Sequence, residues 1–365
     1  MPRPPHILIA GGGTGGHVYP AIAIADAIRA RRPETRVVFA GTNDRLEATA
    51  VPDAGYALHH ITVSGFQRDL SLRNFSFPVR LAKGLMQSWR LVGAIEPDVA
   101  VGTGGYVSGP VLLAARLRGC PIVVQEQNAY AGVTNRLLSL LASQIHLAFP
   151  EARDWVPAGR ATVSGNPTRK SLTQVDVSEA RDVLGLPGNA RVLLVLGGSL
   201  GSAAINDAIE ANLDAVLTDE HVHVIWQTGS RYYDDIHQRV PEHSRLRVLE
   251  YITRMDRAYA AADLALCRAG AITCSELMVT GTPAVLVPSP NVVADHQTRN
   301  ARAMKRAGAA EILPESNLND QLADHVLTLL ADHNVRHQMA DAARREARPG
   351  AADDIAADIL ALANA

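Results

Sequence analysis

The sequence predicts an α/β fold built from two doubly wound, parallel-sheet domains. Short apolar strands alternate with longer helical segments, and these strands are continuously apolar, which is typical of strands covered on both faces. Two of the strands run directly into glycine-rich loops, at residues 6–16 and at residues 191–201. Because a helical segment follows each loop, we expect each half to begin with the same strand–glycine–helix unit.

The bulk composition is that of an ordinary globular chain. Its 365 residues favour two domains, at roughly 150 residues each. A net charge of -2 argues against the basic field that nucleic acid requires. The three cysteines cannot all pair and fit free thiols in a reducing cytoplasm. We find no signal peptide and no apolar run near the ~18 residues of a membrane span, so we expect any membrane contact to be peripheral.

Glycine and proline punctuate the chain at residues 164–167, where we expect the two halves to join. The first domain is therefore predicted to span residues 1–165 and the second residues 166–345. The stretch 351–365 reads as a helix rich in alanine, isoleucine and leucine, and its periodicity assigns it to neither half.

The first loop matches a G-x-G-x-x-G pattern at Gly11, Gly13 and Gly16. Dinucleotide-binding proteins combine this pattern with an acidic residue at the tip of the second strand, which binds the ribose. Here the second strand is expected to end at residues 39–43, and the next acid, Asp44, comes late. A nicotinamide oxidoreductase is thus a weaker alternative. A further alternative is that the glycines only permit a tight turn.

His17 follows the first loop directly, at the edge of the sheet where α/β proteins bind ligands. An imidazole titrates near neutral pH and suits a general base, although a structural role is the alternative. Two more polar strand ends follow at residues 102–109 and 125–128. We expect them to line the same edge; ordinary loop chemistry is the alternative.

In the second half, a strand ends at residues 267–270 and a helix begins at Ala271, where backbone amides suit a pyrophosphate. Glu276 stands in position to accept hydrogen bonds from a ribose diol, or only to complement the helix dipole. Residues 295–298 follow the next strand. Arg169, just past the junction, suits a phosphate or a nucleobase, with an ordinary surface arginine as the alternative.

Residues 66–90 form a basic, amphipathic stretch with five basic residues, one acidic residue and three of the five phenylalanines of the chain. Such a segment can lie in an anionic membrane interface, and a helix packed on its own core is the alternative. The candidate membrane face comprises Phe75, Phe77, Leu81, Leu85 and Trp89.

Six short motifs occur in a characteristic order, at residues 12–17, 104–109, 126–128, 165–167, 197–199 and 275–276. Together they resemble the MurG family of bacterial UDP-N-acetylglucosamine transferases, over residues 6–345. The resemblance implies a GT-B glycosyltransferase with two Rossmann-like domains and an interdomain cleft. It implies an acceptor-binding and membrane-facing first domain, to which a terminal helix at about residues 346–365 returns. The second domain would bind the UDP-sugar.

The activity implied by the resemblance is inverting transfer of GlcNAc. The sugar would move from UDP-GlcNAc to the 4-hydroxyl of the muramyl sugar of lipid I, which gives lipid II for peptidoglycan synthesis. A related GT-B transferase with another lipid or small-molecule acceptor stays open, as does a non-catalytic sugar-nucleotide sensor.

The resemblance also implies roles for individual residues. His17 matches the proposed general base, and Gly104, Gly105 and Tyr106 belong to the acceptor side. The substrate-binding residues are Thr14, Gly15, Gly16, Asn128, Arg169, Ser199, Ile252, Ala271, Ile272, Thr273, Cys274, Ser275, Glu276 and Gln297. The chain departs from the family pattern at Leu200, commonly Gln, and at Ala269, commonly Ser.

The expected partners are UDP-GlcNAc, lipid I and the anionic inner leaflet of the plasma membrane, at its cytoplasmic face. Other cell-wall synthesis proteins are further candidates, and nucleic acid is not expected. The sequence has no Asp-x-Asp motif or histidine cluster. We therefore expect no required cofactor, no obligatory metal and at most an accessory divalent ion.

Overall fold

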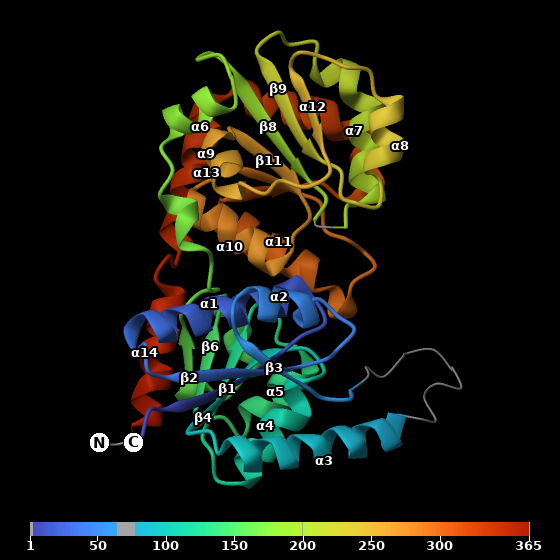
Figure 1. The fold of residues 1–365 in the computed structure, drawn as a ribbon. Helices are drawn as coiled ribbons and strands as arrows, with labels where there is room; N and C mark the ends of the chain where they lie inside the picture. The colour runs from blue at the N-terminus through green and yellow to red at the C-terminus, as the bar shows by residue number, and fades with distance from the viewer. Residues whose placement is uncertain (1–2, 64–76, 199, 365) are drawn as a thin grey trace. The chain divides into compact units, whose positions relative to one another are not determined.

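The computed structural model describes residues 3–63, 77–198 and 200–364 of the chain. It divides the chain into two compact units (Figure 1). The first comprises Met1–Thr168 together with Pro349–Ala365, and the second comprises Arg169–Arg348. The sequence placed the corresponding boundaries after residues 165 and 345.

The first unit is built on a parallel sheet that has seven strands within the described residues, in the order β3-β2-β1-β4-β5-β6-β7. The winding reverses between β1 and β4, and ligands of open α/β sheets bind at such a point, outside the carboxyl ends of the strands. The elements in chain order are β1 His6–Gly11, α1 Gly15–Arg31, β2 Arg36–Gly41, α2 Glu47–Asp53, β3 Ala57–His60, α3 Phe77–Ile95, β4 Val99–Gly104, α4 Ser108–Leu117, β5 Ile122–Glu126, α5 Val133–Ser139, β6 Gln144–Leu147, η2 Pro150–Trp155, η3 Ala158–Arg160, β7 Ala161–Val163 and α14 Ala351–Ala363.

Helices cover both faces of this sheet, so its central strands β1, β2 and β4 are mostly apolar and buried. Ile7 and Ile9 of β1 join the buried cluster that includes Ile28 of α1 and Ile355 of α14. Leu8 and its alternate neighbours face the cluster formed with α3 and α4. Figure 1 shows α14, in red, beside the blue α1, so the end of the described chain completes the core of the first unit.

The second unit contains a parallel sheet with six strands in the described range, in the order β10-β9-β8-β11-β12-β13. Its winding reverses between β8 and β11. Its elements are η4 Lys170–Thr173, α6 Val177–Val183, β8 Arg191–Leu196, α7 Ala203–Val216, β9 Val222–Gln227, α8 Tyr233–Arg239, β10 Leu246–Leu249, α9 Met255–Ala261, β11 Leu264–Cys267, α10 Ala271–Thr280, β12 Ala284–Leu286, η5 Val293–Asp295, α11 His296–Arg306, β13 Ala310–Ile312, η6 Glu315–Asn317, α12 Leu318–Ala331 and α13 His333–Glu346. The predicted pair of doubly wound parallel sheets is confirmed.

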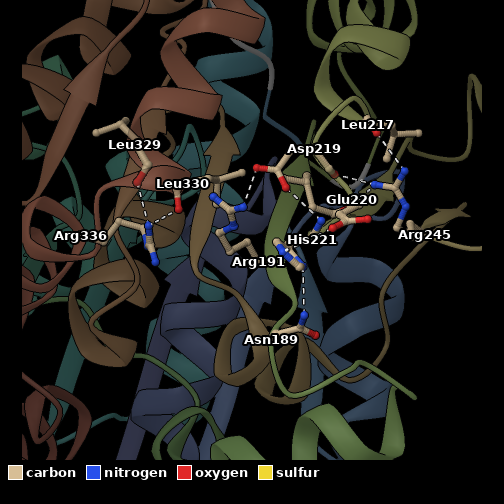
Figure 2. A network of polar contacts seen from close by, with 11 residues as sticks. Asn189, Arg191, Leu217, Asp219, Glu220, His221, Arg245, Leu329, Leu330 and Arg336 are labelled. Carbon is tan, nitrogen blue, oxygen red and sulfur yellow. Dashed lines mark hydrogen bonds and ion pairs between the residues drawn. The ribbon is translucent and has the colours of Figure 1, made fainter.

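A polar network holds the amino ends of the strands in the second sheet (Figure 2). Arg191, at the start of β8, pairs with Asp219 at 2.6 Å. Arg245, just before β10, donates to the carbonyl oxygens of Asp219 at 2.6 Å and of Leu217 at 2.9 Å. Because these groups lie at the edge opposite the carboxyl ends, we assign the network to the stability of the sheet.

Within the described ranges, no helix combines the length and the hydropathy that crossing a bilayer requires.

Candidate active site

His17 lies in the first turn of α1, at the point where the winding of the first sheet reverses. Its Nδ1 is 2.9 Å from the carbonyl oxygen of Thr103 and 3.0 Å from Oε1 of Gln127. The hydroxyl of Thr103 in turn donates to the carbonyl oxygen of His17 at 2.9 Å. The imidazole is therefore held from β4 and from the residue that follows β5.

Gly104 and Gly105, predicted on the acceptor side, lie against His17 and the first glycine loop. Gly104 has a φ of 105°, and a Cβ there would lie 2.7 Å from Nδ1 of His17. Gly105 has a φ of 79°, and its Cβ would lie 2.3 Å from the carbonyl oxygen of Gly12. Tyr106 is exposed beside them. Glycine is thus required here both by the backbone conformation and by the close approach.

The other predicted residues of the first unit lie on neighbouring loops. Thr14 is exposed and precedes α1 without capping it, and Gly15 and Gly16 are the first residues of that helix. The backbone N–H of Asn128 donates to Oε1 of Glu126 at 2.9 Å. Glu126 ends β5, so its carboxylate fixes the direction in which the chain leaves this strand.

A buried carboxylate is hydrogen-bonded to the backbone of the first glycine loop. Glu47 accepts hydrogen bonds from the backbone N–H of Gly13 at 2.8 Å and from the hydroxyl of Thr42 at 2.7 Å. Its side chain is fully buried at the tip of β2, whereas Asp44 is exposed. An acidic side chain therefore does lie at this strand tip, but both of its carboxylate oxygens accept hydrogen bonds from the protein itself. This geometry does not favour a dinucleotide-binding role.

In the second unit, Arg169 and Glu276 come together, as an Nη2–Oε1 pair at 3.2 Å. The hydroxyl of Tyr259 donates to the other oxygen, Oε2, at 3.1 Å. Burial raises the pKa of Glu276, and the partners Arg169 and Tyr259 oppose that rise. Burial also raises the pKa of Tyr259 well above its usual range, so its hydroxyl keeps the proton that it donates.

Glu276 projects from α10, whose beginning was predicted to bind a pyrophosphate. The residue before the helix is Gly270, which makes no side-chain cap. The Ser275 hydroxyl donates back to the carbonyl oxygen of Ala271 at 3.0 Å, and the Cys274 side chain is fully buried. Burial raises the pKa of Cys274 to about 12, so we infer that any ligand contact of this residue is made by its backbone. Ile272 and Thr273 are partly exposed on the first turn.

Gln227, at the end of β9, links two loops that were predicted to hold the donor. Its Nε2 donates to the carbonyl oxygen of Gly198 at 3.0 Å, and its Oε1 accepts from the N–H of Ile252 at 2.9 Å. Ser199 lies outside the described residues. The Gly198 loop and the segment around Ile252 are therefore joined through one side chain.

Gln297, in the first turn of α11, accepts a hydrogen bond from the N–H of Ser289 at 2.9 Å. Of the two departures from the family pattern, Leu200 is highly exposed and Ala269 is fully buried. Across the described ranges, no group of three His, Cys, Asp or Glu residues is arranged to hold a metal ion.

Comparisons with known proteins identify the family. The model for the glycosyltransferase family 28 N-terminal domain matches residues 7–147, and that for the C-terminal domain matches residues 192–355. A relative from Salinibacter ruber is 66% identical and covers 99% of this chain and 98% of its own length. It is named UDP-N-acetylglucosamine--N-acetylmuramyl-(pentapeptide) pyrophosphoryl-undecaprenol N-acetylglucosamine transferase. This chain belongs to the MurG family.

Other relatives agree with this assignment. A protein of the same name from Christiangramia forsetii is 42% identical and covers 98% of each chain. The crystal structure of Acinetobacter baumannii MurG matches with a TM-score of 0.80 and 31% identity, over 98% of this chain and 100% of that one. The resemblance and the GT-B fold class predicted from the sequence motifs are confirmed.

Of the candidate membrane face, Phe75 lies outside the described residues, and the side chains of Phe77 and Leu81 in α3 are also not described. Leu85 is half-buried, and Trp89 is 44% exposed. The sequence therefore located an amphipathic helix, and Trp89 is one of its exposed residues.

Met86 of α3, which follows Leu85, is 57% exposed, and the guanidinium of Arg118, just after α4, lies 4.1 Å from the ring centroid of Trp89. The sequence pattern did not reveal a second group of exposed apolar side chains in the first unit, on α5. Four side chains on and just after α5 are 40% to 67% exposed, namely Val133, Leu137, Leu140 and Leu141. A helix as short as α5 gives no sustained periodicity by which to recognise this face.

Other residues whose roles the sequence did not predict form hydrogen bonds with the candidate site residues. Gln127 belongs to one of the six motifs, but no role was assigned to it. Only its spacing of two residues from Gln125, on an extended chain, indicates that the two side chains lie on the same face of the sheet. Glu47 and Tyr259 give no such signal, because the loop residue that Glu47 binds, Gly13, is 34 residues away and Glu276, the partner of Tyr259, is 17 residues away.

Gly104→Ala tests the close approach at His17. Both this variant and the control Gly119→Ala place alanine at a positive φ, which costs about 1–2 kcal/mol. A Cβ at Gly119 has nothing within 4 Å, whereas at Gly104 it meets the imidazole. We expect Gly104→Ala to lose a further ~1–3 kcal/mol of unfolding free energy through overpacking, measured by denaturant titration. Equal losses in the two variants would contradict the close approach.

Proposed function

We propose that this chain transfers GlcNAc from UDP-GlcNAc to the 4-hydroxyl of the muramyl sugar of lipid I, with inversion, and so forms lipid II. The observation that carries the proposal is its 66% identity, over 99% of the chain, to a transferase of that name. The geometry supports the proposal, because His17 follows β1 and α10 follows β11, and the winding of each sheet reverses beside these strands.

In this reaction the 4-hydroxyl oxygen attacks the anomeric carbon while the bond from that carbon to the UDP oxygen breaks. The bonding electrons leave with UDP, and the proton of the hydroxyl passes to His17. A neutral imidazole is a suitable acceptor for this proton near pH 7. The ring is fixed by Thr103 and Gln127, so it need not be oriented during the reaction.

The second unit would hold the donor. We propose that Glu276 accepts hydrogen bonds from the ribose diol, and that Arg169 and the first-turn amides of α10 stabilise the charge that develops on UDP. The Ser199 loop, Ile252 and Gln297 would complete this site. Tyr259 contributes indirectly, since its hydroxyl orients the carboxylate of Glu276.

The first unit would meet the lipid acceptor at a membrane surface. We propose that α3, with the exposed apolar residues of α5, rests on the anionic inner leaflet at the cytoplasmic face. Arg80, Lys83 and Arg90 of α3 provide the charge for this contact. We further propose that the reaction needs no cofactor and no protein-bound metal, and that other cell-wall synthesis proteins are partners.

The function is tested by following radiolabelled GlcNAc from UDP-GlcNAc into lipid II, in buffer with EDTA. We expect turnover by the natural chain.

For His17→Ala we expect kcat to fall by about 10²–10⁴-fold, since this is what a general base contributes. The His237→Ala variant, on α8 of the second unit, is the matched control and should keep the kcat of the natural chain. Tight binding of NADH with no binding of UDP-GlcNAc would refute the proposal, and a nearly unchanged kcat for His17→Ala would refute the base.

Tyr259→Phe tests the donor site by calorimetric titration with UDP. Removing the hydroxyl takes away the donor that orients the carboxylate of Glu276 toward the ribose diol, so we expect binding to weaken by about fivefold to thirtyfold in Kd, or about 1–2 kcal/mol. Tyr233→Phe, on α8 of the same unit, should bind UDP as the natural chain does. An unchanged Kd for Tyr259→Phe would remove Glu276 from the nucleotide site.

Met86→Ser combined with Trp89→Ser tests the membrane surface by sedimentation with phosphatidylglycerol vesicles. Both side chains are large and substantially exposed, so we expect binding to weaken by about tenfold or more. The control combines Val177→Ser and Val183→Ser on α6, which are also more than half exposed. If only the control loses binding, the membrane face belongs to the second unit.

A further inference from the structure

We propose that Gln127 is a positioning residue that keeps the imidazole of His17 protonated at Nδ1, and that a buried chain of side-chain amides sets the direction of this contact. The contribution to turnover rests on the proposed function, in which His17 is the base. The protonation of the ring nitrogens follows from the hydrogen bonds alone.

The direction of the chain is set at Asn166, close to the end of the first unit. Its Nδ2 donates to the backbone carbonyl oxygen of Gln127 at 3.0 Å, and a carbonyl oxygen can only accept. The amide nitrogen of Asn166 is thereby identified. Its Oδ1 must accept, and it does so from Nε2 of Gln125 at 2.9 Å.

The same logic continues through the next two amides. Because Gln125 donates with its nitrogen to Asn166, its Oε1 is left as an acceptor, and Nε2 of Gln127 donates to it. Nε2 of Gln127 also donates to the carbonyl oxygen of Thr103 at 2.5 Å. The oxygen of the Gln127 amide is therefore the atom that faces His17.

The three side-chain amides are buried, so water cannot replace the hydrogen bonds between them. Gln125, Gln127 and Asn166 are 0%, 1% and 2% exposed. Turning any one amide over would place two donors or two acceptors against each other in a medium of low dielectric, where such an error is costly. The chain therefore has one low-energy direction.

At its end, Nδ1 of His17 meets two acceptors, Oε1 of Gln127 at 3.0 Å and the carbonyl oxygen of Thr103 at 2.9 Å. A nitrogen between two acceptors must carry the proton. In the neutral ring Nε2 is then unprotonated, and a general base needs such an atom. Both acceptors also stabilise the imidazolium that forms when Nε2 receives the proton of the sugar hydroxyl.

The assignment is tested on the full chain labelled with ¹⁵N-histidine. The ring nitrogens of His17 are identified by the signals that disappear in His17→Asn, and we expect a protonated Nδ1 with an unprotonated Nε2. Gln127→Met removes one of the two acceptors at Nδ1 and leaves the carbonyl oxygen of Thr103, so we expect it to raise the fraction of the opposite form and to lower kcat by about twofold to fivefold, because that fraction has no base. The KM for UDP-GlcNAc should stay within about twofold, since the donor site lies in the second unit.

Gln144→Met is the matched control. Gln144 begins β6 of the same sheet, and its buried Oε1 belongs to no part of the amide chain. This variant should keep the natural spectrum and rate. Gln125→Met breaks the chain one step before Gln127 without touching His17. It should give a smaller shift of the spectrum in the same direction, because the carbonyl oxygen of Thr103 still accepts from Nε2 of Gln127, and it serves as the test if Gln127→Met does not fold.

A natural chain whose His17 is protonated at Nε2 would overturn the proposal. So would a Gln127→Met variant that folds and keeps both the natural spectrum and the natural kcat. A protonated Nδ1 in a chain that transfers no sugar would refute the proposed function while supporting the assignment of the ring.

Discussion

The first unit depends on how closely the backbones at the ends of β1 and β4 approach each other. A Cβ at Gly11 would lie 2.0 Å from Oγ1 of Thr103, and one at Gly105 would lie 2.3 Å from the carbonyl oxygen of Gly12. No residue with a side chain fits at these positions without a shift. This approach brings the carbonyl of Thr103 beside His17, so main-chain packing supplies one of the two acceptors that orient the imidazole, and Gln127 supplies the other.

Glu47 in the first unit and Glu276 in the second are buried carboxylates whose hydrogen bonds are satisfied in different ways. Glu47 accepts from a loop amide and from Thr42, and it fixes the shape of the glycine loop. Glu276 accepts from Arg169, which is itself half-exposed, and from Tyr259. The partners of Glu47 are a backbone amide and a neighbouring hydroxyl, whereas one partner of Glu276 is a charged side chain that is partly open to solvent.

The sequence predicted the features that local patterns encode. Strand, glycine loop and helix follow one another within a few residues, so both units and the position of His17 could be inferred from their order. The contact between His17 and Gln127 spans 110 residues, and that between Arg169 and Glu276 spans 107. Spacing cannot reveal such pairs. Roles for Gln127, Glu47 and Tyr259 could not be assigned until the topology placed their partners beside them.

The return of α14 to the first unit makes the second unit an insertion within the first. The cluster of Ile7, Ile9 and Ile28 includes Ile355, which is synthesised only after the whole of Arg169–Arg348. During translation, α1 can already cover part of this face of the first sheet, but the part that α14 covers stays exposed until the whole second unit has been synthesised. The unit that begins first is therefore completed last.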